Sequence, residues 1–279
     1  MADPQHLKLL MQNVADWNAW REKYPEITPD LSETGLYGAY HGGLDLSNIN
    51  LSGADLHQSD VCGDINLEGA TFQFANLQGT HFFDVNLHHV DFQGVHLSQA
   101  SFSYTTMTEA NLDGTDLRGV LFEDGTVLSR AHLSRADLRE LDLSGSILNG
   151  ANMSEALLER TILNRCEMVQ VILTRASLPN AKMTRTDLCV ADLSDALLCN
   201  IDPSYTNLSE ANLSGADLRG ANLSHTNLSD AFLIEADLRN TDLSHADLSG
   251  VCLVGANLSG ANLYGALLGS ADLQAAVLS

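Results

Sequence analysis

Histidine and cysteine are the side chains in this sequence that could ligate a metal or act as nucleophiles. Four of the ten histidines fall close together, at His81, His88, His89 and His96. The five cysteines are Cys62, Cys166, Cys189, Cys199 and Cys252, an odd number with no C-x-x-C spacing. Cysteine spacing of this kind predicts neither a zinc site nor a disulfide framework.

Serines are abundant, but none lies in the G-x-S-x-G turn that exposes the nucleophile of many hydrolases. The sequence therefore offers no catalytic, cofactor-binding or metal-ligating set. We expect a protein that is not an enzyme and that needs no cofactor.

A third group of reactive side chains recurs at intervals of twenty residues. It comprises Arg165, Arg185, Tyr205, His225 and His245. Two arginines held one above the other repel each other unless an anion or a carboxylate lies between them. The tyrosine and the two histidines would extend such a pair into an interaction stripe. The alternative is a solvated corner without a binding role.

These side chains are positioned by a five-residue repeat, Ala-(Asp/Asn)-Leu-x-x, whose cleanest run is residues 206–263. Its central apolar residue recurs from Leu31 onward, with an exception at His41 and single-residue insertions within 61–67 and 123–126. A period of five fits neither a helix nor a plain strand. Each unit should form one short extended face and one corner, with Leu and the residue two before it inward and Asp or Asn outward.

The units A-D-L, A-N-L and T-N-L, followed by S-G, R-G or S-x, resemble the pentapeptide-repeat family over about residues 29–279. The resemblance implies an all-β solenoid, a right-handed quadrilateral β-helix with four five-residue faces per coil and about 12 coils. Residues twenty apart should then stack. Phe72 should stack on Phe92, with Phe82, Phe102 and Phe122 on the opposite face, while Cys189 and Cys199 lie on opposite faces and cannot bridge.

The first residues differ from the repeat. Apolar residues at helical spacing, including both tryptophans, predict an amphipathic helix over 5–24 that Pro25 and Pro29 terminate. We therefore divide the chain into a helical cap, residues 1–28, and a repeat domain, residues 29–279. The helix would cover the first coil. A role at a membrane surface would need a basic polar face, which the three basic and three acidic residues of positions 1–23 do not give.

Charge is strongly acidic and unevenly spread. The formal net charge is −22, a field that repels nucleic acid and anionic membranes and favours basic partners. Between Tyr24 and Leu117 there are 13 acidic residues and no Lys or Arg, whereas Arg118 to Arg185 is nearly neutral. This nearly neutral waist carries apolar residues at outward positions: Val127, Ile147, Leu157, Ile162, Ile172 and Leu197. They could form a contact surface, with Val127 stacked on Ile147, or be tolerated aliphatic side chains on a β surface.

These observations favour a non-catalytic protein-protein interaction or structural protein. The alternative is an acidic DNA mimic that binds and inhibits or protects DNA gyrase or another type II topoisomerase, as some family members do. The chain lacks their usual helical, aromatic C-terminal tail and long loops. We expect a protein partner, no direct nucleic-acid or membrane binding, and a cytoplasmic location, since no signal peptide or membrane span is present. The last coil, with Leu273 and Leu278, could support an end-to-end homodimer.

Overall fold

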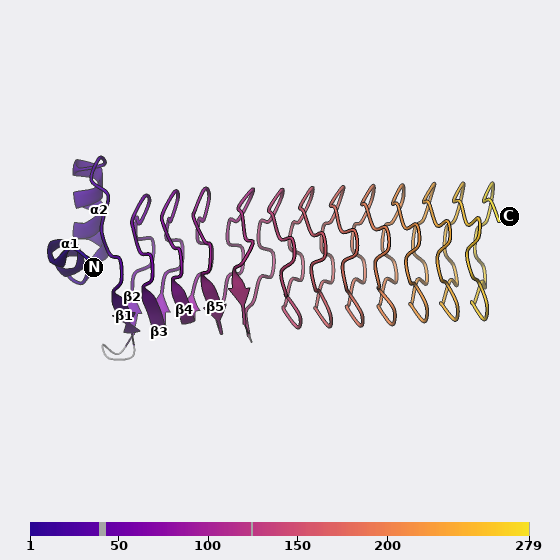
Figure 1. Ribbon diagram of the computed structural model, residues 1–279, viewed down its shortest axis with the longest axis horizontal. Coiled ribbons are helices and arrows are strands. Elements are labelled where there is room, and N and C mark those ends of the chain that lie inside the picture. Colours follow the sequence, from indigo (N-terminus) through magenta and orange to yellow (C-terminus); the bar gives the residue numbers. More distant parts are fainter. Residues whose placement is uncertain (39–42, 124, 279) are drawn as a thin grey trace. The chain divides into compact units, whose positions relative to one another are not determined.

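The computed structural model describes residues 1–38, 43–123 and 125–278 (Figure 1). The chain forms two compact units, Met1–His132 and Leu133–Ser279. Both are built from stacked coils whose parallel bridges mostly join residues twenty apart, so the predicted all-β solenoid with four five-residue faces per coil is confirmed. The irregularity expected at His41 lies outside the described residues.

The N-terminal segment is helical, but the prediction of one helix over 5–24 was wrong. The structure has two helices, α1 (Pro4–Leu10) and α2 (Val14–Lys23). The break occurs because Asn13 adopts an extended conformation and caps α2, its side-chain oxygen accepting a hydrogen bond from the Asp16 N–H at 2.7 Å. Asn favours such a cap over the helix interior.

Helix α2 covers the first coils of the unit Met1–His132. The Trp17 ring is fully buried, and its indole N–H donates to the Asn50 carbonyl at 2.7 Å. The Arg21 guanidinium donates to the carbonyls of Ile27 and Ser52 at 2.7 and 2.8 Å. The bonds to Asn50 and Ser52 give hydrogen-bond partners to backbone carbonyls of the coils.

The same unit contains the regular strands. They are β1 (Gly35–Tyr37), β2 (Leu44–Asp45), β3 (Asp60–Asn66), β4 (His81–Asn86), β5 (Ser101–Ser103) and β6 (Leu121–Phe122). All pair in parallel, in the order β1-β3-β4-β5-β6, with β2 also on β3. These strands account for about four turns, fewer than the about 12 coils expected. Elsewhere the coils meet through single bridges, because each corner interrupts the ladder after about two residues.

The pairing register explains the irregularities of the repeat. Regular coils pair residues twenty apart, as Phe82 does with Phe102. A shift between Cys62 and Ile65 confirms the first insertion. A second shift lies between Phe122, which pairs with Phe102, and Val127, which pairs with Thr106. It confirms the second insertion, although Asp124 within it is outside the described residues.

Inside the coils, the central Leu and the small residue two before it are buried throughout most of both units. The phenylalanines follow the predicted map. Phe72 stacks on Phe92 with ring centroids 5.4 Å apart, and Phe82 stacks on Phe102 at 5.0 Å. Phe102 also stacks on Phe122 at 5.6 Å, although Phe122 is only half-buried. The aromatic pattern is therefore core packing.

The outward Asp or Asn of each unit shapes the corner that follows it. Its side-chain oxygen accepts a hydrogen bond from the backbone N–H two residues later, as in Asp142 to Ser144 at 2.9 Å and Asn212 to Ser214 at 3.2 Å. The last residue of the unit then takes a left-handed backbone conformation, as Arg165 does at φ 60°. Asn side chains also donate to the previous coil, as Asn207 does to Asp187 at 2.9 Å.

Candidate functional site

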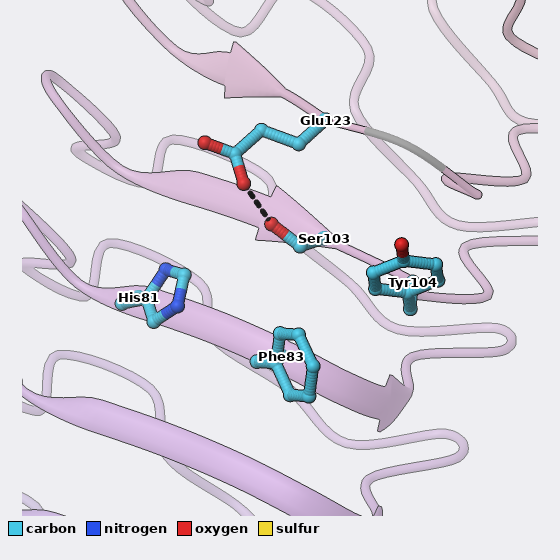
Figure 2. Close-up of a pocket in the computed structure, with 5 residues that line it drawn as sticks. All are labelled: His81, Phe83, Ser103, Tyr104 and Glu123. Carbon is cyan, nitrogen blue, oxygen red and sulfur yellow. Dashed lines mark hydrogen bonds between the residues drawn. The ribbon is translucent and has the colours of Figure 1, made fainter.

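A hollow of about 510 Å³ lies on the wall of the unit Met1–His132 that carries β4, β5 and β6 (Figure 2). His81 and Phe83 project from β4, Ser103 from β5, Tyr104 from the corner after it, and Glu123 from the residue after β6. Register places Phe83 directly beside Ser103 on neighbouring strands. The hollow is therefore assembled from three successive coils.

Two aromatic rings form one side of this hollow. The rings of Phe83 and Tyr104 meet edge to face, with centroids 5.6 Å apart and an interplanar angle of 72°. They are 41% and 56% exposed, so part of each ring is accessible to a ligand. Tyr104 lies against Gly125, where an added Cβ would come within 2.8 Å of the tyrosine ring. Glycine at that corner thus makes room for the ring.

Polar groups form the other side. The buried Ser103 hydroxyl donates to the Glu123 carboxylate (Figure 2), and His81 Nδ1 lies 2.5 Å from the Ser101 hydroxyl. The serine hydrogen bond fixes the carboxylate across the hollow from the aromatic pair.

A second hollow of about 280 Å³ adjoins the first and shares Tyr104 with it. Asp64 and Asp84 line it, and these two residues occupy the same left-handed corner position as Tyr104, with φ of 43°, 55° and 52°. In the described part of the chain, neither aspartate nor Glu123 forms an ion pair with a basic side chain. Exposed rings beside carboxylates attract cations, through cation–π attraction and charge-assisted hydrogen bonds.

Sequence reasoning missed this site. His81 was considered only as a metal ligand, and Phe83, Tyr104 and Glu123 were not singled out. The signal was present: Phe83 and Tyr104 occupy the two variable positions of their repeats, where Ser, Arg or Gly is usual, inside the segment without basic residues.

The predicted stripe is brought together in the unit Leu133–Ser279. Tyr205 stacks on His225 with centroids 4.8 Å apart, and His225 stacks on His245 at 5.0 Å. Tyr264, not predicted, meets His245 edge to face at 5.4 Å. Arg165 and Arg185 line a hollow of about 450 Å³ with Ser144, Gly145, Asn164 and Thr184. Whether the stripe binds a partner stays a prediction.

The predicted apolar waist is dispersed. Leu157, Ile172 and Leu197 are exposed, whereas Val127, Ile147 and Ile162 are half-buried. Their paired neighbours are mostly polar: Glu167 beside Ile147, Asn152 and Asp192 beside Ile172, and Ser177 between Leu157 and Leu197. Val127 belongs to the first unit and Ile147 to the second, so their expected stacking stays a prediction. Within the second unit these residues do not form a continuous column.

Three further residues, Arg219, Arg239 and Cys166, have structural roles. Arg219 forms a two-bond fork with Asp217, at 2.8 and 2.6 Å, and Arg239 does the same with Asp237. Each arginine thus neutralises the aspartate two residues before it, and the arginine hydrogen bonds hold the pKa of each carboxyl below its usual range. Burial raises the pKa of the Cys166 thiol to about 11, and the thiol donates to the Leu143 carbonyl. The group is therefore not a ready nucleophile.

In ranges 1–38, 43–123 and 125–278, no three His, Cys, Asp or Glu side chains are grouped so that they could hold a metal ion. No helix in the same ranges has the length and hydrophobicity needed to cross a membrane.

In the last coil, Leu273 is half-buried and Leu278 is 58% exposed.

Comparison with known proteins now identifies the class. The family model for pentapeptide repeats matches eight times, over residues 30–63, 65–103, 80–119, 124–150, 151–188, 191–230, 216–255 and 256–279. The chain belongs to the pentapeptide-repeat family. No curated protein matches it.

Several solved structures are similar. HetL, a pentapeptide repeat protein involved in heterocyst differentiation regulation from Nostoc sp. strain PCC 7120, is 29% identical, with 85% of this chain and 92% of HetL covered and a TM-score of 0.48. A pentapeptide repeat protein of the Arabidopsis thaliana thylakoid lumen is 30% identical, over 37% of this chain and 68% of that one, with a TM-score of 0.32. A trypsin-treated form of QnrB1, a plasmid-mediated fluoroquinolone resistance protein, is 18% identical over 64% and 84%, with a TM-score of 0.32.

Proposed function

We propose that this chain is a non-catalytic protein-binding module whose N-terminal unit receives a basic segment of a partner protein. The observation that carries the proposal is the pair of hollows around Tyr104, where exposed aromatic rings stand between carboxylates that lack basic partners. A lysine or arginine side chain would lay its cation against Phe83 and Tyr104 and hydrogen-bond Glu123 or Asp84. The aliphatic stem of that side chain would cover the rings.

The surrounding charge supports the same partner. No Lys or Arg occurs between Tyr24 and Leu117, so a basic segment meets no repulsion along these coils.

A cytoplasmic site of action remains part of this proposal; cell fractionation tests it. End-to-end pairing through the last coil is a further proposal, and sedimentation velocity tests it.

The experiment measures binding of a fluorescent arginine-rich peptide by anisotropy at two salt concentrations. We expect Phe83→Ala with Tyr104→Ala to weaken binding about 5- to 30-fold, since cation–π contacts at exposed sites contribute about 0.5–1 kcal/mol each. Phe74→Ala is the matched control, because Phe74 is a 73% exposed aromatic residue of the same unit outside the hollow. Equal affinity of the double variant and the control would refute the site.

A second proposal uses the same acidic coils: imitation of DNA at a type II topoisomerase. Asp64 and Asp84, at equivalent corners of successive coils and without basic partners, favour it. Asp217 and Asp237 weigh against it in the second unit, because arginines neutralise them. A gyrase supercoiling assay separates the two proposals. Inhibition that disappears when acids within residues 45–116 are replaced by Lys supports mimicry, and no effect at micromolar protein excludes it.

A further inference from the structure

Two arginines of the unit Leu133–Ser279 lack the partners that other arginines have. Within the described residues, eight other arginines form ion pairs with carboxylates at 2.6–4.0 Å. Among the described residues, no carboxylate lies within ion-pair distance of Arg165 or Arg185. Yet the two occupy the same corner position on successive coils, with φ of 60° and 59°, and line one hollow.

The neighbouring carboxylates are engaged elsewhere. Asp142 accepts from the Ser144 hydroxyl at 2.5 Å, and Glu167 accepts from the Asn149 amide at 3.2 Å. Asp187 accepts from Asn207 at 2.9 Å, and Asp202 accepts from Asn222 at 3.0 Å. These acids lie on the walls that flank the corner, while the two guanidinium groups line the hollow itself. Within the described residues, the hollow therefore combines a polar lining with two positive charges that form no ion pair.

The polar lining suits an oxyanion. Thr184 donates through both its backbone N–H and its hydroxyl to the Asn164 Oδ1, at 3.0 and 2.8 Å. That arrangement holds the Asn164 carbonyl oxygen against Thr184 and leaves the amide NH₂ as the donor end of the side chain. Gly145 ends the row, and a Cβ added there would meet no atom within 4 Å. The corner beside Arg165 is consequently open.

We propose that Arg165 and Arg185 form a binding site for a phosphate-type oxyanion, with Asn164 as an additional donor. An anion between the two guanidinium groups removes their mutual repulsion and accepts several charge-assisted hydrogen bonds. The ligand is either free phosphate or a phosphoryl group on a peptide. Both present the same tetrahedral oxygens. This site is independent of the cation-binding hollow in the other unit.

Isothermal titration calorimetry with the full chain tests the proposal. One arm titrates inorganic phosphate, and the other titrates a phosphoserine peptide with its unphosphorylated form as reference. We expect saturable binding in at least one arm and a loss of 10-fold or more in Arg165→Gln with Arg185→Gln. Binding of phosphate alone assigns the site to the free ion, whereas a preference for the phosphopeptide assigns it to a modified partner.

The matched control is Arg160→Gln with Arg175→Gln, which removes two arginines that already pair with Glu140 and Asp195. It removes the same charge from the same unit and should leave binding within 2-fold of the unaltered protein. Circular dichroism checks that both double variants are folded. Absence of saturable binding in both arms, or equal losses in the two double variants, would overturn the proposal.

Discussion

Replacing Phe102 should reveal how much of the first unit's stability comes from its aromatic core. The ring is fully buried and contacts three others: it stacks on Phe82 and Phe122, and meets Phe92 edge to face at 6.2 Å. Removing a buried phenylalanine side chain costs about 3–5 kcal/mol of unfolding free energy. Phe102→Leu installs the residue usual at this position but loses the ring contacts, worth about 0.5–1.5 kcal/mol per pair. We expect about 1–3 kcal/mol for Leu and about 3–5 kcal/mol for Ala.

Urea unfolding followed by tryptophan fluorescence measures this effect. Trp17 and Trp20 both belong to the unit Met1–His132, so the signal reports its unfolding without assuming that the whole chain is two-state. With a urea dependence of about 1–3 kcal/mol per M, Phe102→Ala should lower the midpoint by about 1 M or more. Phe74→Ala, at an exposed corner, should change stability by at most about 0.5 kcal/mol. If the two alanine variants shift the midpoint equally, the ring stack is not a major source of stability.

Three further outcomes are expected. Thr80→Val should lower stability by about 1 kcal/mol, because the buried Thr80 hydroxyl donates to the Leu56 carbonyl at 2.8 Å. Thr115→Val should be neutral or stabilising, because the buried Thr115 hydroxyl has no hydrogen-bond partner among the described residues. Urea titrations of the two variants side by side compare these effects. Arg219→Gln should slightly destabilise the second unit at pH 6, and this effect should disappear once the pH falls below the lowered pKa of Asp217. The reason is that Arg219 lowers the pKa of Asp217 in the folded state. The ionised Asp217 therefore contributes stability above its unfolded-state pKa, and this stability is lost as the pH falls through the lower folded-state pKa. Circular dichroism melts at several pH values measure the change. Asn13→Ala should cost about 1 kcal/mol by removing the cap of α2, with Trp17 fluorescence as the readout.

The sequence predicted the coil because every unit repeats the same demand for inward Leu and outward Asp or Asn. It located the two insertions and the stacked phenylalanines, since these depend only on counting residues. It did not predict the break before α2, where one Asn capping bond outweighs continuous helical spacing. Nor did it predict the ion pair of Arg160 with Glu140, because that contact depends on side-chain conformations that no residue count contains.

Both candidate sites use the last two positions of the five-residue unit. In the compact unit Met1–His132 these positions hold Phe83 and Tyr104, and in the unit Leu133–Ser279 they hold Asn164 and Arg165. The repeat consensus does not specify the residue type at either position. The first and third positions are restricted by burial, and in most coils the second carries the Asp or Asn that forms the turn. The last two project from a corner whose backbone is already satisfied by neighbouring coils, as the Arg165 N–H is by the Thr184 carbonyl at 3.1 Å. Binding chemistry can therefore vary at these corners while the fold is retained, and the partner of a pentapeptide-repeat protein is to be sought in its departures from the consensus.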